Sequence, residues 1–475
     1  MDTREFRDMG HRVVDLVAAY LEGVEERPLF PKVEPRTLEA LFDEPLPAEP
    51  QAPDALLREI EEKLLPYCIQ VNHPGYFGYM TPTPAPVGVL ADFLASALNQ
   101  NVGFWSIGPS AVAIERQTVR WLDGLVGYGP RSGGNLTSGG TMANFIALKL
   151  ARDFASGDRA QIEGVRDRWA AYVSEERHVS IDKAVDAVGA GREGLRALPT
   201  DDAFRVRIDA LEEALARDRA SGVRPMCVIG LAGTTNTGSI DDLRALRRIA
   251  DREKAWFHVD AAYGGGMLLS REHPGLLEGL ASADSITLDP HKWFYAPLDA
   301  GAILVKEEER LTRSFGMRPS YLADPMDPKG ERYAYFVHGF EQSRRFRSLK
   351  VWMSFKRYGA AEIGRWVDAN VAQAERLHAL AEAHPHFLSA TPPRMSAICL
   401  RYEPRGLEEL APLHAEVARR IEKGGRFWVS TTVLKGKTFF RINPVNFRTR
   451  LEHVEAFFEA LGGECEKTVR ESPVG

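Results

Sequence analysis

The stretch MCVIGLAGTTNTGSIDDLRALRRIADREKAWFHVDAA (226–262) carries a complete strand, helix and strand pattern. Its ends, 226–233 and 255–262, are short apolar runs bounded by Gly, Asp or charged residues, which is typical of buried strands. Between them, DDLRALRRIADREK (241–254) has the periodicity of a surface helix. Such a unit predicts an α/β protein with a mostly parallel sheet, right-handed crossovers and ligands at the carboxyl ends of the strands.

Similar runs follow at DSITLD (284–289) and AGAILVK (300–306), and the α/β pattern begins near residue 86. Residues 307–345 interrupt it with prolines and dense charge, so we expect a long active-site loop there. From about residue 360 a smaller α/β unit closes the chain, with strands expected at SAICLRY (396–402) and TFFRINP (438–444). We therefore expect three parts, an N-terminal helical arm (1–85), a large domain (86–358) and a small C-terminal domain (359–475).

The arm opens with apolar residues at helical spacing over about five turns, so one face of an amphipathic helix needs a partner surface. These residues are Phe6, Met9, Val13, Leu16, Val17, Tyr20 and Val24. The proline-rich stretch 28–53 then prevents a single regular element. A helix tied on by such an extended arm is expected to pack on a second subunit.

Composition favours an ordinary globular protein. The chain is 27% charged and 44% hydrophobic with a net charge of -6, which is near the average for folded domains. Its length of 475 residues is enough for two or three domains. Basic side chains are scattered, and the one dense cluster, RRFR (344–347), is too short to follow a phosphate backbone. We expect no nucleic-acid partner.

The four cysteines, Cys68, Cys227, Cys399 and Cys465, are far apart and form no metal-ligand pair. A reduced, cytoplasmic protein without a metal site is the simplest interpretation. The start MDTREFRDMG lacks an apolar signal region, and no apolar run approaches the roughly 20 residues that cross a bilayer. We therefore expect neither a signal peptide nor a membrane span.

Three separate patterns indicate one cofactor. GNLTSGGTMANFIALKLARDFA (134–155) leads from glycines and small hydroxyls into a helix, whose free amides suit a phosphate, although a plain capped helix looks the same. In HVDAAYGG (258–265), Asp260 ends an apolar strand, where a pyridinium nitrogen is a suitable partner. In DPHKWF (289–294), Lys292 follows a strand in an apolar setting that suits imine chemistry, although strand-end aspartates and surface lysines are common. Together they predict pyridoxal 5'-phosphate.

These motifs resemble the group II pyridoxal-dependent decarboxylases, the family of aromatic L-amino-acid and histidine decarboxylases. The resemblance covers nearly the whole chain and also includes EFRDMGHRVVDLVAAYLEGVEERPLFPKVEP (5–35), HPGYFGYM (73–80) and RRFRSLK (344–350). It implies an aspartate-aminotransferase-like fold (fold type I) in a homodimer, with the N-terminal arm packed on the partner subunit.

The resemblance also implies residue roles. Lys292 would hold the cofactor as a Schiff base, Asp260 would pair with the pyridine nitrogen, and His178 would stack on the ring. A helix-cap or core histidine is the alternative for His178. Tyr321, a loop tyrosine, would protonate the substrate carbon and serve the partner's site. The cofactor-binding set is Gly139, Gly140, Thr141, His178, Thr235, Asp260, Ala262, Asp289, His291 and Lys292.

The aromatic substrate class rests on the resemblance and on Tyr79 and Phe104, which match pocket positions but are equally plausible as core residues. Met80 stands where the family often has phenylalanine, and Met is more adaptable. Asp289 stands where animal members have asparagine. Ser343 is more typical of enzymes for phenol or imidazole side chains than for indole.

The predicted reaction is decarboxylation of tyrosine, dopa, tryptophan or phenylalanine to the arylalkylamine. The presence of both His178 and Tyr321 argues against the aldehyde-forming branch, in which one of them is typically changed. Histidine, glutamate or aspartate decarboxylation and an aminotransferase reaction stay open, with Arg441 as the candidate carboxylate-binding arginine of the last. A catalytically silent scaffold is the remaining alternative, and intact Lys292 and Asp260 argue against it.

Overall fold

The computed structural model describes residues 1–317, 327, 331–407 and 409–471. The chain divides into two compact units. The small-sheet unit comprises Met1–Tyr79, Gln373–Ala390 and Cys399–Gly475, and the large-sheet unit comprises Met80–Ala372 and Thr391–Ile398. The three-part division expected from the sequence stays a prediction.

The large-sheet unit is built on a seven-stranded sheet in the order β1-β7-β6-β5-β4-β2-β3. Neighbours from β6 to β3 are parallel, and β7 alone runs antiparallel to both of its neighbours. The mostly parallel α/β sheet is therefore confirmed, as are the four strands expected in 226–306. The strands are β1 (Gly133–Thr137), β2 (Trp169–Ser174), β3 (Leu195–Leu198), β4 (Arg224–Leu231), β5 (Trp256–Asp260), β6 (Ser285–Leu288) and β7 (Gly301–Val305).

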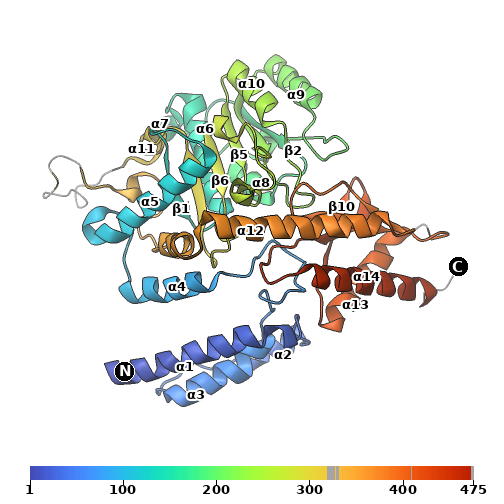
Figure 1. The fold of residues 1–475 in the computed structure, drawn as a ribbon. Coiled ribbons are helices and arrows are strands. Elements are labelled where there is room, and N and C mark those ends of the chain that lie inside the picture. The colour runs from blue at the N-terminus through green and yellow to red at the C-terminus, as the bar shows by residue number, and fades with distance from the viewer. Residues whose placement is uncertain (318–326, 328–330, 408, 472–475) are drawn as a thin grey trace. The chain divides into compact units, whose positions relative to one another are not determined.

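Helices flank these strands (Figure 1). The helix expected at 241–254 is α10, which begins where the Asp242 side chain accepts from the Ala245 amide and ends at Lys254 in the left-handed region. In this unit the helices are α4 (Pro86–Leu98), α5 (Pro109–Val126), α6 (Gly140–Ser156), α7 (Ala160–Glu163), α8 (Val179–Ala187), α9 (Ile208–Ala220), α10 (Leu243–Glu253), α11 (Glu309–Phe315) and the first part of α12 (Ser348–Glu382).

The expectation of one long loop over 307–345 is wrong in part. Residues 309–315 form α11, because Leu311, Ser314 and Phe315 share a buried face. The helix is too short for its periodicity to show against the surrounding charges. A 3-10 turn follows at Tyr335–Val337. Residues 318–326 and 328–330, and with them Tyr321, lie outside the described part.

The small-sheet unit has a four-stranded sheet in the order β10-β11-β9-β8. The strands expected at 396–402 and 438–444 are confirmed as β9 and β11. Its strands are β8 (Phe387–Ser389), β9 (Ile398–Tyr402), β10 (Ser430–Leu434) and β11 (Lys437–Ile442), and its helices are α1 (Thr3–Glu22), α2 (Pro35–Leu41), α3 (Pro53–Glu59), α13 (Leu410–Gly424), α14 (Leu451–Glu471) and the end of α12.

The predicted N-terminal helix is confirmed as α1, which Asp2 caps by accepting from the amides of Arg4 and Glu5. Its apolar face lines an apolar cavity together with residues of the segment 56–65, yet Val13 and Val17 are still 40% and 36% exposed. The face is thus only partly covered within the described chain. No described helix combines the length and the apolar character that a bilayer-spanning segment requires.

The dense basic cluster at 344–347 serves the core of the large-sheet unit. Arg344 is buried against buried Glu115, with Nη2 donating to Oε1 at 2.5 Å and to the Leu136 carbonyl at 2.8 Å. Glu115 also accepts from the Leu136 amide at 3.0 Å. This pair fastens α5 and the segment before α12 to β1, the strand that leads into α6.

Removing one partner of this pair leaves a buried, unpaired charge, so Arg344→Met should lower the free energy of unfolding by about 3–5 kcal/mol. The double variant with Glu115→Met should recover much of that loss. Exposed Arg345→Met is the control and should cost under about 1 kcal/mol. Urea unfolding followed by tryptophan fluorescence measures all three, and equal losses for Arg344→Met and the control would contradict the assignment.

Candidate active site

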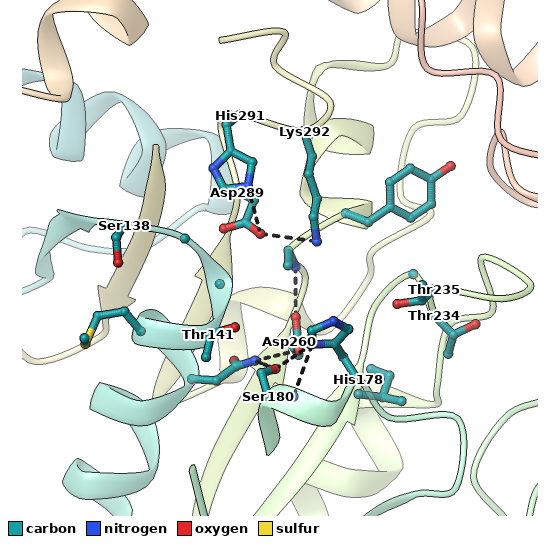
Figure 2. A pocket seen from close by; sticks show the side chains of 18 of the residues that line it. Ser138, Thr141, His178, Ser180, Thr234, Thr235, Asp260, Asp289, His291 and Lys292 are labelled. Atoms are coloured by element: carbon teal, nitrogen blue, oxygen red, sulfur yellow. Dashed lines mark hydrogen bonds and ion pairs between the residues drawn. The ribbon is translucent and has the colours of Figure 1, made fainter. Parts of the chain in front are cut away.

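A cavity of about 340 Å³ lies where β1, β2, β4, β5 and β6 end, as the sheet topology predicted. All ten residues expected to bind the cofactor line it (Figure 2). They are Gly139, Gly140, Thr141, His178, Thr235, Asp260, Ala262, Asp289, His291 and Lys292. The sequence thus predicted one cluster from segments that are more than a hundred residues apart.

The turn between β1 and α6 forms one wall. Gly139 has φ 140°, which side chains disfavour, and a Cβ on Gly140 would lie 2.8 Å from Oδ2 of Asp289. Position 139 therefore favours glycine because of its backbone conformation, and a side chain at position 140 would force Asp289 to shift. The amides of the first turn of α6 have no acceptor within the helix, so Gly140 and Thr141 offer donors to an anion.

His291 and Asp289 lie beside this turn. His291 Nδ1 accepts from the Ala300 amide at 3.0 Å, and burial lowers the His291 pKa. The neutral ring therefore carries its proton on Nε2, which faces Asp289 Oδ2 at 3.7 Å. The second carboxylate oxygen of Asp289, Oδ1, is buried without a hydrogen-bond partner among the described residues.

The prediction of an apolar setting for Lys292 is wrong for its amino group. Nζ lies 3.2 Å from Oδ2 of Asp289, so the amine is paired with a carboxylate. The neighbouring aromatic side chains are buried elsewhere, and Trp293 stacks on Tyr263 at 4.8 Å. The aromatic residues next to Lys292 in the sequence therefore did not indicate what its amine contacts.

Asp260 ends β5 and is only 9% exposed. Its Oδ1 accepts from the Ala262 amide at 3.0 Å and its Oδ2 accepts from Asn144 Nδ2 at 2.8 Å. Figure 2 shows Lys292 reaching toward Asp260 from the far side of the cavity, with His178 beside the carboxylate. A carboxylate and a primary amine thus face one space.

His178 is both a helix cap and a cavity residue. Its Nδ1 accepts from the Ser180 amide at 3.2 Å at the start of α8, while the ring lines the cavity. Burial, followed by the nearby charge of Lys292, lowers the His178 pKa. A helix-capping role and a position beside the cofactor, which the sequence left as alternatives for His178, are therefore compatible.

Sequence reasoning missed several lining residues, above all Asn144 and Ser180. Asn144 is one helical turn after Gly140, so counting the helical period from the glycine turn would have placed it on the cavity face. Ser180 follows the capping histidine by two residues. The other missed lining residues are Ser138, Met142, Glu176, Leu231, Gly233, Thr234, Tyr263 and Leu298.

The predicted substrate residues are placed differently. Met80, Phe104 and Ser343 belong to the large-sheet unit but are not among the residues that line this cavity. Phe104 packs edge-on against Phe336 at 5.8 Å, and Ser343 is exposed. Tyr79 belongs to the small-sheet unit, where it is exposed and packs on Trp428 at 4.9 Å. Their role in substrate binding stays a prediction.

The cavity fits pyridoxal phosphate in three respects. Helix amides and a neutral His291 N–H suit the phosphate, buried Asp260 suits a protonated ring nitrogen, and Lys292 supplies the amine for the aldehyde. One group fits less simply, because the Asp289 carboxylate adjoins the anion-binding turn.

Comparison with known proteins agrees with this fit. Residues 35–403 match the family model described as the pyridoxal-dependent decarboxylase conserved domain. An aromatic-L-amino-acid decarboxylase of Bacillus atrophaeus is 32% identical, covering 96% of this chain and 94% of the relative. A phenylacetaldehyde synthase of Arabidopsis thaliana is 29% identical, covering 98% and 96%.

A crystal structure of Oryza sativa TDC with PLP and tryptamine superposes with a TM-score of 0.92 at 27% identity, covering 98% of this chain and 99% of that one. This likeness confirms the expected aspartate-aminotransferase-like fold, fold type I. Since the family model matches most of the sequence and the cavity holds the residues that the cofactor needs, the chain belongs to the pyridoxal-phosphate-dependent decarboxylases, a family of carboxy-lyases.

Proposed function

We propose that this enzyme decarboxylates an aromatic L-amino acid, such as tyrosine, dopa, tryptophan or phenylalanine, to the arylalkylamine and carbon dioxide. The main support is the relative from Bacillus atrophaeus, which matches nearly end to end. The cavity adds support, because its described lining includes Met142, Leu231, Tyr263 and Leu298 but no arginine that would hold an acidic side chain.

In this proposal each residue of the cavity has a defined task. Gly140, Thr141 and His291 would hold the phosphate, and Lys292 Nζ would hold the aldehyde. When bound, pyridoxal phosphate supplies a ring that withdraws electrons from the substrate α-carbon. Asp260 keeps a proton on the ring nitrogen, which sustains that withdrawal.

His178 and Tyr321 would act on the proton that the former α-carbon takes up. The ring of His178 would cover the cofactor ring, keep water from the reacting carbon and assist Tyr321. Tyr321 then donates its hydroxyl proton to the former α-carbon, which commits the reaction to an amine. We place Tyr321 in the partner's site, as the resemblance implies.

Rival reactions differ in which groups they require. An aminotransferase needs an arginine free to bind a substrate carboxylate, whereas Arg441 donates to the Gly78 carbonyl and to Ser430 within the small-sheet unit. The aldehyde-forming reaction remains a real alternative, since the Arabidopsis relative is a phenylacetaldehyde synthase. The products therefore have to be identified individually.

Purified, cofactor-loaded enzyme should release one carbon dioxide and one amine per aromatic amino acid, and Lys292→Ala should abolish both products because no amine remains to bind the aldehyde. Lys183→Ala, an exposed change on α8, is the control and should keep full activity. Chromatography of the products from tyrosine, dopa, phenylalanine, tryptophan, histidine and glutamate measures this. Aldehyde with ammonia, glutamate turnover, or amino transfer without carbon dioxide would each replace the proposal with the corresponding reaction.

The Asp289 carboxylate opposes the cofactor twice, because it adjoins the turn that binds the phosphate and pairs with the amine that must react. Asp289→Asn removes the charge and keeps the shape. We expect its dissociation constant for pyridoxal phosphate to fall about tenfold.

Titration of cofactor-free protein, followed by the absorbance of the bound cofactor, measures that constant. Asp251→Asn makes the same chemical change on the exposed face of α10 and should leave the constant unchanged. Weaker binding by Asp289→Asn would mean that the carboxylate helps to hold the cofactor.

We further propose a homodimer in the cytoplasm. Free thiols at Cys68, Cys227 and Cys465 support a reducing compartment. The partly covered face of α1 supports a partner subunit, and so does α4, where Leu90, Leu94 and Leu98 are 51%, 44% and 56% exposed. Apolar rows of this kind are typical of subunit interfaces.

Placing charges in that row should disrupt the dimer. Leu90→Lys with Leu94→Lys is expected to give a monomer at concentrations where the parent enzyme is dimeric, because two buried charges would lack partners. Analytical ultracentrifugation measures the mass, and Lys183→Ala is again the control. A parent protein that is monomeric at micromolar concentration would refute the proposal.

A further inference from the structure

A buried polar network lies behind the cavity and centres on Asn144, which is only 1% exposed. Its Nδ2 donates to Asp260 Oδ2 at 2.8 Å and to Ser180 Oγ at 2.9 Å. Its Oδ1 accepts from Thr287 Oγ1 at 2.7 Å and lies 3.0 Å from His258 Nε2. All four hydrogen-bonding positions of the amide are therefore used.

The carboxylate of Asp260 determines the direction of these bonds. A carboxylate only accepts, so the amide nitrogen must face Asp260 and the amide oxygen must face His258. His258 therefore carries a proton on Nε2. Burial lowers the His258 pKa to about 4.

The far end of the network holds His258 from the other side. The indole of Trp256 can only donate, and it donates to Ser285 Oγ at 2.8 Å. His258 Nδ1 lies 2.9 Å from Ser285 Oγ and 3.1 Å from the Ser285 carbonyl oxygen. The orientation of the Asn144 amide therefore rests on the Asp260 carboxylate, which can only accept.

The same argument extends to the cavity through Ser180. Because Ser180 Oγ accepts from Asn144, its own proton points to His178 Nδ1 at 2.9 Å. That nitrogen also accepts from the Ser180 amide at 3.2 Å. His178 Nδ1 therefore has no proton, and the proton of the neutral ring is on Nε2, the nitrogen that α8 leaves free.

We infer that Asn144 is a positioning residue, whose single amide orients the Asp260 carboxylate and directs the Ser180 hydroxyl to His178 Nδ1, where it joins the Ser180 amide in keeping the proton on Nε2. One side chain thereby orients both Asp260, which would pair with the cofactor nitrogen, and His178, which would cover the cofactor ring. The inference rests on the proposed function for its use in catalysis, but the proton pattern itself is a property of this chain.

The tautomers can be read directly by nitrogen NMR of histidine-labelled, cofactor-free protein, with His178→Gln and His258→Gln to assign the signals. The parent should show His178 protonated on Nε2 alone and His258 protonated on Nε2. Asn144→Leu should shift the His178 Nδ1 resonance, because Ser180 loses the donor that directs its hydroxyl to Nδ1, while the Ser180 amide keeps the proton on Nε2. The same variant should bind pyridoxal phosphate at least about tenfold more weakly, since Asp260 loses a buried donor.

A matched control separates positioning from general loss of stability. Asn135→Leu also removes a buried amide of the large-sheet unit, one that donates to the His338 carbonyl at 2.7 Å, and should leave the His178 Nδ1 resonance and the cofactor constant unchanged. Asn144→Ser keeps a small donor and should restore part of the cofactor affinity. It also serves as the readout if Asn144→Leu does not fold.

The inference fails if the parent carries the His178 proton on Nδ1, or if both Asn144 variants keep the parent Nδ1 resonance of His178 and bind the cofactor within twofold of the parent. The outcome is independent of the substrate. If no aromatic amino acid is decarboxylated while the tautomer pattern holds, the proposed function alone is refuted.

Discussion

The Asp260 carboxylate is a charge buried at the end of a central strand, and much of the large-sheet unit is arranged to compensate it. A buried charge without donors costs several kcal/mol, so neighbouring elements have to supply hydrogen bonds. The Ala262 amide and Asn144 do so, and Asn144 is itself held by Thr287 and His258. Compensation of one charge therefore joins α6 to β5 and β6.

A second charge problem lies on the opposite side of the cavity. The glycine turn before α6 presents amides suited to an anion, yet Asp289 places a carboxylate against it and pairs with Lys292. This pairing engages only Oδ2, and Oδ1 is buried without a hydrogen-bond partner among the described residues. The phosphate of a bound cofactor and the Asp289 carboxylate would compete for the amides of the glycine turn. The affinity of this site for the cofactor therefore depends on Asp289 as well as on the turn.

The sequence predicted the parts of this enzyme that are local. The apolar runs that became β4 and β5, the glycines before α6 and the lysine after β6 each lie within a short motif, so their placement followed from strand and helix patterns. The rest of the predicted cofactor set, such as His178 and Thr235, came from the family resemblance, and the whole set lines one cavity.

Prediction was weaker wherever a residue's role depends on partners remote in sequence. Asn144 meets Asp260 across 116 residues, and nothing in LTSGGTMAN (136–144) indicates that contact. The amine of Lys292 was expected among its aromatic neighbours, whereas the turn of the chain directs it to Asp289. The basic cluster RRFR gave no hint of a core role, because the burial of Arg344 against Glu115 depends on a contact 229 residues apart.

The glycine pair at 139 and 140 also limits how this enzyme can diversify. Every single-base change that replaces a glycine adds at least a Cβ, which at one position strains the backbone and at the other collides with a carboxylate. A substitution at 139 therefore strains the backbone, and one at 140 needs a compensating change at Asp289. New cofactor preferences would have to arise from side chains around the glycine turn, such as Thr141 and Asp289. These side chains, and not the two glycines, are the part of the site that can change in evolution.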